Sequence, residues 1–568
     1  MLKICTVLFV ASMGTTVSAV AASQSDISRL LSGHISNEQT GEPAPTPPPM
    51  DDEQSARAPA LTLSEACPHL AHLRTADITT GLAQLYQHSD FAPMWDSQSR
   101  LDALHEELEK LADDGLVVED YPFHRQVTGA LDTCAELRLS SEFLLALEHL
   151  GTGRFEQQAY EPMWQRAETR SAEPLIMQWT RAGLVDVHAA FDQARPKLDL
   201  YVDLRNAYIR LRDENPEYAH ITAGDLVRPG GHDPRLPLLT KRLESAGYLS
   251  ELASIDAPPF STTDPAADPG TQVQQAEAAQ MLDTRLEQAL KHFQSDHGLK
   301  ADGVLGPNSL AALNMTTRER LDIARINLER LRWINSLLED DVLLVNSARN
   351  LLRHYRQGEV IWQTNVITGR PGRDTPSIVS RLDRITLNPN WTVPPTIRRE
   401  DMIPEIRKDL GYLERKNLIV IDYQGNLLDP HSIDWHDPRG LMLRQPPGPD
   451  NPLGQVVFRF DNPHAIYLHD TPNRRLFSRV QRNLSSGCVR VEGVDILASS
   501  MFSRLSDSKR AQIERQRASG LTHQVAIGNG PQVVLGYWTA EADDKGRLLL
   551  TQDPYGKDHA LMDAFANR

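Results

Sequence analysis

The spacing of apolar residues changes near residue 340, and this change divides the chain into a helical part and a β part. Before it, leucines recur every three or four residues, as in LDALHEELEKLADDG at 101–115, which is the spacing of one helix face. After it, short apolar runs are broken by turn residues, as in DVLLVNSARNLLRHYRQGEVIWQTNVITG at 341–369, which predicts successive antiparallel strands. We therefore predict a multidomain α+β protein.

The length and charge of the chain limit its organisation and its partners. A chain of 568 residues is too long for one hydrophobic core and predicts two to four domains. The net charge of −17 argues against a nucleic-acid partner, because nucleic-acid-binding surfaces concentrate lysine and arginine.

The N-terminus has the layout of a secretory signal followed by a linker. Lys3 precedes an apolar run, and small residues follow at Ala19 and Ala21, so we predict a cleaved signal peptide over 1–21 and export. An uncleaved membrane anchor is the alternative, because the apolar run is close to the shortest membrane span. Residues 22–61 include GEPAPTPPPMDDEQSARAPA, a Pro-rich polar stretch that predicts a disordered linker.

Export makes the four cysteines informative. Cys5 lies within the predicted signal peptide. Cys67 and Cys134 lie in one helical region, where they either form a disulfide or are separately buried as small apolar residues. Cys488 has no cysteine near it in the sequence, so its chemistry needs another explanation.

The helical part divides into three segments. Residues 62–235 carry no group of chemically reactive side chains and predict a helical scaffold domain. The stretch LEQALKHFQSDHGLKADGVLGPNSLAALN at 286–314 predicts a small helical bundle, and its FQ, GL, DG and GP pairs resemble the signature of the peptidoglycan-binding module of bacterial wall enzymes. The resemblance implies such a module over 236–316, as a wall-binding unit or as a spacer. A helical connector is predicted over 317–340.

The β part is predicted to form one mainly antiparallel domain over 341–540. A long segment of helical character, about 396–445, interrupts the strand pattern. A long excursion from a β domain is more often functional than not, so we predict a helical cap that acts as a lid, with a surface decoration as the alternative. Residues 541–568 are left as a C-terminal tail.

Two short strands of this domain carry polar residues on one face. In AIYLH, Tyr467 and His469 alternate with aliphatic residues, and in CVRV, Cys488 and Arg490 do the same. If both strands bury their aliphatic side, the four polar side chains project from one surface. The spacing of 19 residues from His469 to Cys488 (488 − 469) implies neighbouring strands joined by a loop.

These residue types suit nucleophilic catalysis by a thiol. A cysteine at its usual pKa is mostly protonated near neutrality and needs a neighbouring base or cation. His469 would be that base, and Arg490 adds positive potential. Gly487 allows close approach of a substrate, and the amides from Ser486 to Cys488 would form an oxyanion hole, worth about 3 kcal/mol per donor.

Three other interpretations of Cys488 remain open at this point. A lone cysteine in a strand is often an inert buried residue. A metal site would recruit His464, His469 and Cys488, but their spacing is irregular and no fourth ligand is near. A papain-like peptidase fits less well, because its cysteine precedes its histidine, whereas here the histidine comes first.

The longer motif resembles one known family. YLHDTP…SSGCVRV is similar to the signature of the L,D-transpeptidase (YkuD-type) catalytic domain, in which a histidine strand is followed by Ser-x-Gly-Cys-x-Arg. VITGRPGRDTPS, NPNWTVPPTI and PPGPDNPLGQVVFRF resemble three further segments of that family. With its scaffold, module and cap, the chain resembles the large YcbB-type branch of Gram-negative bacteria over nearly everything after residue 62. Two departures are Ser486, where many members have histidine, and Asp470, where His-Gly-Thr is common.

The resemblance implies roles for individual residues. Cys488 is expected to be the nucleophile and His469 the general base and acid. The amides of Gly487 and Cys488 are expected to form the oxyanion hole. The side chains expected to bind or support the substrate are Arg490, Ser486, Tyr467 and Trp391.

The implied function is peptidoglycan remodelling in the periplasm. Cys488 would attack the meso-diaminopimelate carbonyl of a tetrapeptide stem, release D-alanine, and pass the acyl group to a second stem's amine as a 3→3 cross-link. Resolution by water, a free D-amino acid or a lipoprotein lysine would instead give carboxypeptidase, exchange or attachment activity. Stem peptides are the expected partners, other wall synthases are further candidates, and a non-catalytic wall-binding scaffold is the alternative of a different class. The family implies no metal or organic cofactor and implies sensitivity to carbapenems.

Overall fold

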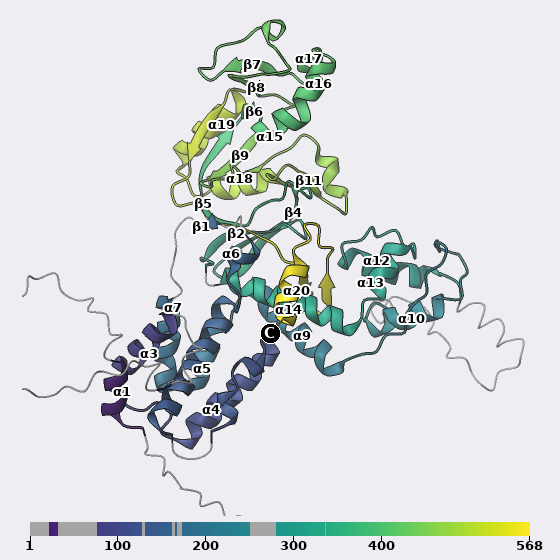
Figure 1. Cartoon of the computed structure of the whole chain (residues 1–568). Coiled ribbons are helices and arrows are strands. Elements are labelled where there is room, and N and C mark those ends of the chain that lie inside the picture. Colours follow the sequence, from purple (N-terminus) through teal and green to yellow (C-terminus); the bar gives the residue numbers. More distant parts are fainter. Residues whose placement is uncertain are drawn as a thin grey trace, which may run out of the picture. The chain divides into compact units, whose positions relative to one another are not determined.

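The computed structural model describes residues 22–31, 67, 76–127, 131–161, 165–166, 173–249, 280–335 and 337–567. The chain divides into two compact units, drawn in Figure 1. The predicted signal peptide (1–21) and linker residues 32–61 lie outside the described residues. None of the helices that the structure describes is long and apolar enough to cross a membrane.

The first unit covers 1–112, 116–151 and 171–195, and its described part is helical, as predicted for the scaffold. Its core contains the predicted leucine stripe, with Leu104 and Leu108 fully buried beside Phe143 and Phe191. A disulfide joins Cys67 to Cys134, which decides between the two alternatives that the sequence left open. The helices are α1 (Gln24–Leu31), α3 (Ala76–His88), α4 (Gln98–Lys110), the 3₁₀ turns η2 (Leu111–Asp114), η3 (Val118–Asp120) and η4 (Phe123–Arg125), α5 (Thr133–Thr152), α7 (Glu173–Val185) and α8 (Val187–Ala194).

Helix α1 corrects part of the linker prediction. The Pro-rich range 22–61 begins with a helix, and Ile27 on that helix is fully buried in the core of the first unit. Ser23 accepts a hydrogen bond from the Asp26 N–H at 3.3 Å, which is a helix-starting contact. The prediction of disorder is therefore wrong for these eight residues, because one buried isoleucine outweighs the polar composition around it.

The second unit begins with short elements and a small helical bundle. Leu286, Leu290 and Phe293, predicted to form one stripe, are buried together in a core of their own. Gln294 lies inside this bundle, accepts the Gly303 N–H at 2.8 Å, and so fixes the loop between its helices. The elements are α6 (Gln157–Tyr160), β1 (Gln165–Arg166), α9 (Asp199–Glu214), α10 (Leu236–Ser245), α12 (Thr284–Asp296) and α13 (Pro307–Leu313).

The β domain is a ring of strands packed against two helices. Strands β5, β14, β2, β3, β4, β12, β10 and β9 pair in that order, and β9 also pairs with β5, which closes the ring. Most of these pairings are antiparallel, as predicted, while β10–β12 and β14–β2 are parallel. The strands are β2 (Asp341–Asn346), β3 (Leu351–Arg356), β4 (Glu359–Gly369), β5 (Ile378–Leu387), β9 (Val456–Phe460), β10 (Leu468–His469), β11 (Asn483–Ser485), β12 (Val489–Val491), β13 (His523–Ala526) and β14 (Gln532–Gly536).

Strand alternation gives this ring two buried faces. On β2, Leu343 and Val345 face the core inside the ring. Val342 and Leu344 face the other way and pack with α9 and α14 (Thr317–Asn335). The core inside the ring is also covered by α18 (Val494–Phe502) and α19 (Asp507–Ala518), through residues such as Leu497. A sheet covered on both faces is rigid, which suits a site that must hold its geometry.

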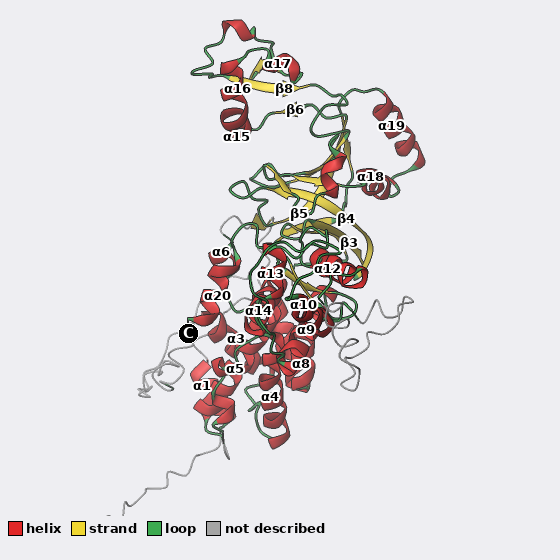
Figure 2. Ribbon diagram, turned by 90° about the vertical axis from the view of Figure 1, so that its right-hand side faces the viewer, coloured by secondary structure: helices red, strands yellow, loops and turns green. Residues whose placement is uncertain are grey.

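The cap insertion has its own core and its own sheet. Figure 2 shows its strands apart from the ring. Val420, Leu441 and Leu443 are buried in a cluster separate from that of the ring. The insertion carries the predicted helices and also a three-stranded antiparallel sheet of order β6-β8-β7, which the sequence analysis did not predict. Its elements are β6 (Trp391–Thr392), α15 (Pro395–Ile397), the π-helical turn η6 (Arg398–Met402), α16 (Ile403–Lys408), α17 (Tyr412–Arg415), β7 (Ile419–Asp422), the 3₁₀ turn η7 (Pro430–Ser432) and β8 (Leu441–Gln445).

The C-terminal segment, left as a tail by the sequence, folds against the rest of the second unit. It forms β15 (Ala540–Ala542), β16 (Leu548–Leu550) and α20 (Asp558–Ala566). Glu541 is buried and accepts hydrogen bonds from Arg353 on β3 at 2.7 Å and from the Trp538 indole N–H at 2.8 Å. Arg353 and the nearby Arg349 outweigh the effect of burial and lower the pKa of Glu541 to about 2, so the carboxylate is ionised and ties the segment to the β domain.

Candidate active site

The strands that carry the motif are neighbours, as predicted. Strand β10 pairs with β12 in parallel, with Leu468 opposite Val489 and His469 opposite Arg490. The Val489 N–H donates to the Tyr467 carbonyl at 3.1 Å, so the register sets Cys488 beside Tyr467. Leu468 and Val489 are fully buried inside the ring, and alternation directs Tyr467, His469 and Arg490 to the other face. The partly buried Cys488 also packs against the edge of the core inside the ring.

Ala465 and Tyr467 lie beside the thiol, and the Cys488 sulfur is 3.9 Å from the Ala465 carbonyl oxygen. Burial raises the pKa of Cys488, and the neighbouring N–H and hydroxyl of Tyr467 oppose that rise, as do the charges of Arg490 and Arg459. The Tyr467 ring also meets the His469 ring edge to face, with centroids 5.6 Å apart. Tyr467 therefore bridges the thiol and the imidazole.

His469 is held as a neutral imidazole. It is buried, and its Nδ1 lies 2.6 Å from the Asp470 carbonyl oxygen. A carbonyl only accepts, so this contact assigns the proton to Nδ1 and leaves the lone pair on Nε2. Burial, reinforced by the charge of Arg490, lowers the pKa of His469 to about 3. At neutral pH the resting pair is thus a thiol and a neutral imidazole that is free to accept a proton.

The loop before Cys488 is fixed by hydroxyl groups. The Ser485 hydroxyl donates to the Cys488 carbonyl at 2.6 Å and accepts the Gly487 N–H at 3.1 Å. Thr375 donates to the Gly487 carbonyl at 2.7 Å. The predicted oxyanion donor Gly487 is therefore already bonded to Ser485. The Cys488 N–H has no acceptor among the described residues, which makes it the better-placed oxyanion donor.

Gly487 occupies a conformation that glycine favours. Its φ is +115°, and a Cβ added there would lie 3.0 Å from the Ile466 side chain. A larger residue would be strained by both effects. The glycine of the Gly-Cys pair is therefore required by the backbone.

Arg373 joins the catalytic loop to the cap, and the sequence analysis did not identify it. It donates to the Ser486 hydroxyl at 3.0 Å, to both carboxylate oxygens of Asp401 at 2.6 and 2.8 Å, and to Glu400 at 2.8 Å. Hydrogen bonds from Arg373 lower the pKa of Asp401. Arg373 and Thr375 both lie in VITGRPGRDTPS, a stretch noted for its family resemblance, and that was the available signal.

The two remaining predicted residues have different surroundings. Arg490 has no ion pair or hydrogen bond to any described residue, and its Nε is buried without an acceptor; burial lowers its pKa. Trp391 lies on β6, pairs with Gln445, and packs against the core of the cap. None of its described contacts is with Cys488, so its substrate role stays a prediction.

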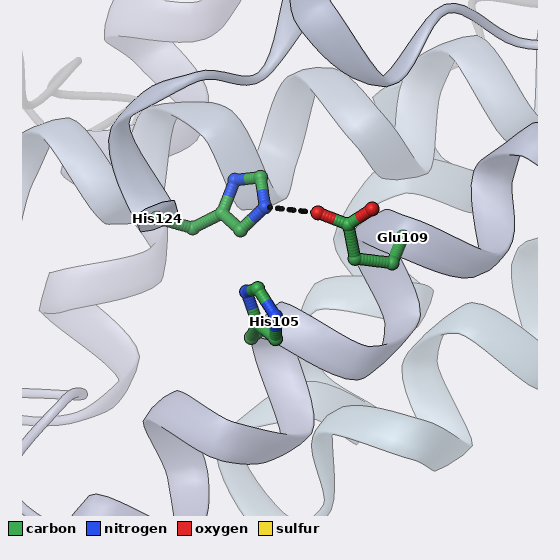
Figure 3. Close-up of side chains that lie close together, drawn as sticks. All are labelled: His105, Glu109 and His124. Carbon is green, nitrogen blue, oxygen red and sulfur yellow. Dashed lines mark hydrogen bonds and ion pairs between the residues drawn. The ribbon is translucent and has the colours of Figure 1, made fainter. Parts of the chain in front are cut away.

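A group of metal-ligating side chains occurs elsewhere, in the first unit. His105, Glu109 and His124 offer ligand atoms that all lie within 4.8 Å of one another (Figure 3), and this is the one such group among the described residues. The alternative metal site of His464, His469 and Cys488, considered from the sequence, is not such a group among the described residues. Arg125 donates to both carboxylate oxygens of Glu109, at 2.6 and 2.9 Å, so that carboxylate is already engaged.

Comparisons with known proteins match three segments of the chain. Residues 340–505 match the model described as "L,D-transpeptidase catalytic domain", 80–207 match "Scaffold domain", and 233–313 match "Putative peptidoglycan binding domain". A Haemophilus influenzae protein named "Putative L,D-transpeptidase" is 37% identical over 239 residues, which are 42% of this chain and 48% of that protein. The match thus spans about half the length of that relative.

Solved structures give weaker likenesses. An L,D-transpeptidase from Mycobacterium smegmatis is 14% identical, covers 34% of this chain and 58% of its own, and has a TM-score of 0.16. A structure described as the Ldtfm-avibactam carbamoyl enzyme is 10% identical, covers 59% of this chain and 96% of its own, and has a TM-score of 0.20. Scores this low carry no argument about the fold. By the family models, this chain contains segments similar to an L,D-transpeptidase catalytic domain, a scaffold domain and a putative peptidoglycan-binding domain.

Proposed function

We propose that this protein is an exported L,D-transpeptidase that forms 3→3 cross-links between peptidoglycan stems. One observation carries the proposal. His469 on β10 lies opposite Arg490 on β12, and Cys488 directly precedes β12, inside the segment that matches the catalytic-domain model; Arg490 has no ion pair with a described residue. The peptidoglycan-binding match supports a wall substrate, and such a substrate favours a periplasmic location.

The acylation step uses the neutral thiol and imidazole pair. As the sulfur of Cys488 attacks the meso-diaminopimelate carbonyl of a tetrapeptide stem, Nε2 of His469 takes the thiol proton. The developing oxyanion is stabilised by the Cys488 N–H. The carbon–nitrogen bond then breaks, and His469 returns the proton to the amine of the departing D-alanine. The product is a thioester on Cys488.

The second step reverses these roles. The side-chain amine of a second stem attacks the thioester, His469 accepts a proton from that amine, and the thiol is restored when the carbon–sulfur bond breaks. Arg490, which has no carboxylate partner among the described residues, is suited to bind a carboxylate of either stem. Water, a D-amino acid or a lysine amine in place of the second stem would give the related activities.

The cap is proposed to act as a lid over these subsites. Through Asp401 and Glu400 it holds Arg373, which in turn holds Ser486 next to the Gly487–Cys488 pair. A displacement of the cap would therefore be transmitted to the catalytic loop.

Mass spectrometry of the products tests the proposal. The protein lacking residues 1–21 is mixed with disaccharide-tetrapeptide, beside a Cys488→Ala variant. We expect a dimer that has lost one D-alanine, formed only when Cys488 is present. Loss of D-alanine without a dimer would instead indicate a carboxypeptidase. If neither a product nor a thioester forms, the catalytic proposal fails under these conditions and the wall-binding scaffold becomes the favoured function. A scaffold would keep its role in cells after Cys488→Ala.

A further inference from the structure

One cavity in the second unit is lined by many basic side chains. It has a volume of about 470 Å³ and is lined by residues of α9, of the peptidoglycan-binding-like bundle and of the β15–β16 turn. Five of its lining residues are lysine or arginine and one, Glu214, is acidic. The chain as a whole has a net charge of −17, so the positive charge of this cavity is a local feature and does not follow from the composition.

Arg242 is the buried cation at the centre of this feature. Its side chain is almost fully buried, its Nε donates to the Leu313 carbonyl at 2.9 Å, and its guanidinium carbon lies 3.3 Å from the centroid of the Tyr218 ring. Tyr218 therefore covers one face of the guanidinium. Nη1 and Nη2, at its edge, are buried and have no hydrogen-bond acceptor among the described residues.

Arg320 adds a second buried positive charge. Its Nε and Nη2 donate to the carbonyls of Met315 and Ala312 at 3.1 and 2.9 Å. Burial and the neighbouring charge of Arg242 lower the pKa of Arg320 to about 10. The side-chain hydrogen bonds of both arginines go to backbone carbonyls, and neither arginine forms an ion pair with a described carboxylate. Buried charges normally occur with a counter-charge, so this pair lacks an anion.

His297 indicates that the anion should have a hydrogen-bond donor next to it. Its Nδ1 donates to the Phe293 carbonyl at 2.9 Å, which leaves a lone pair on Nε2. That Nε2 is buried and has no hydrogen-bond partner in the part of the chain that the structure describes. It would accept a hydrogen bond from an N–H or O–H group. A peptide terminus offers both features, because its carboxylate follows directly after an amide N–H.

We propose that this cavity binds the terminal carboxylate of a peptide, with the guanidinium groups of Arg242 and Arg320 taking the carboxylate and Nε2 of His297 accepting the adjacent amide N–H. The identification of this peptide as a peptidoglycan stem rests on the proposed function; the rest of the inference does not. The cavity would then hold a stem peptide on the bundle while Cys488 acts on another.

Photo-cross-linking locates the bound peptide and separates this site from the active site. The full chain after residue 21, carrying Cys488→Ala, is irradiated with a tetrapeptide stem that bears a diazirine at its N-terminus, and the labelled residues are mapped by mass spectrometry. We expect labels on segments that line the cavity, such as those around Tyr218 and Tyr248, and separate labels near residue 488. Arg242→Gln should reduce the cavity labels at least tenfold and leave those near residue 488 unchanged. Arg228→Gln, which changes an exposed arginine of the same unit, is the matched control.

Two further arms decide the ligand chemistry. A peptide with an amidated terminus should lose the cavity labels on unmutated arginines, which tests the proposal even if Arg242→Gln does not fold. Inorganic phosphate in excess should compete poorly. Cavity labels that survive Arg242→Gln or amidation would overturn the proposal, and phosphate that competes as well as the peptide would overturn its peptide assignment. If labels appear only near residue 488, this inference is overturned and the proposed function stays intact. If labels appear only at the cavity, the proposed function is contradicted and this inference stays intact.

Discussion

Burial favours the neutral thiol of Cys488, and this makes a prediction about pH. Burial raises the pKa of Cys488 and lowers that of His469 to about 3. The rate of alkylation of Cys488 by iodoacetamide should therefore keep rising through pH 9, with no plateau near the usual thiol pKa. Tyr467→Phe removes a hydroxyl that stabilises the thiolate, so it should lower the alkylation rate at any fixed pH in this range. A plateau below pH 7 would contradict this account, because it would require a preformed thiolate–imidazolium pair.

At the same scale, Gly487 should tolerate no side chain. Gly487→Ala adds a Cβ 3.0 Å from Ile466 at a φ of +115°, and we expect a loss of about 1–3 kcal/mol in unfolding free energy with loss of acylation. Gly528→Ala is the matched control, because Gly528 also has a positive φ, of +73°, but has nothing within 4 Å of the added carbon. Thermal melting and thioester formation measure the two effects. Equal losses in both variants would show that backbone conformation, and not the contact with Ile466, sets the requirement.

At the scale of elements, Arg373 should couple the cap to catalysis. Asp401 and Glu400 are partly exposed, and exposed ion pairs contribute little stability, so Arg373→Ala should change the unfolding free energy by under about 1 kcal/mol. It should nevertheless lower kcat/KM about tenfold or more, because Ser486 loses its support. Arg415→Ala breaks a cap ion pair with Asp409 that does not reach the catalytic loop and should leave kcat/KM unchanged. Steady-state kinetics with both variants make the comparison, and equal kcat/KM values would refute the coupling.

The elements also show what the sequence could reveal. The strands of His469 and Cys488 were predictable as neighbours, because His469 lies in β10 and Cys488 directly precedes β12, and both strands are short runs of alternating character. Thr375 was not predictable as part of the site, because its hydrogen-bond partner Gly487 is 112 residues away. The two residues come together only when the ring of strands closes. The cap sheet and α1 were missed for a related reason. In both, a few apolar residues such as Ile27 decide the fold inside a polar stretch.

For the second unit as a whole, acid should be destabilising. His469 and His297 are buried and have pKa values of about 3, well below the usual histidine value. Between pH 6.5 and 3 the unfolded chain therefore binds protons that the folded chain does not, and stability falls as pH falls. Each histidine should contribute on the order of a few kcal/mol at the acidic end of this window. Glu541, with a pKa of about 2, adds a further loss below pH 4.5.

Calorimetry at pH 7, 6, 5 and 4 measures this trend. His297→Gln should flatten the decline, because the variant loses one of the two groups that must be buried neutral. His559→Gln is the matched control, since His559 is exposed and pairs only with Asp563. A melting temperature that is constant from pH 7 to 4 would contradict the two low histidine pKa values.

The first unit should depend on its disulfide and not on pH in this way. Cys67 and Cys134 are 67 residues apart, and a crosslink over such a distance restricts the unfolded chain, which typically stabilises the fold by about 2–4 kcal/mol. Cys67→Ser with Cys134→Ser should therefore lower the melting temperature of the first unit. Because Cys488 is the one free cysteine among the described residues, the double variant should still form the thioester. If thioester formation is lost while the β domain keeps its melting transition, the scaffold has a role in catalysis beyond its own folding.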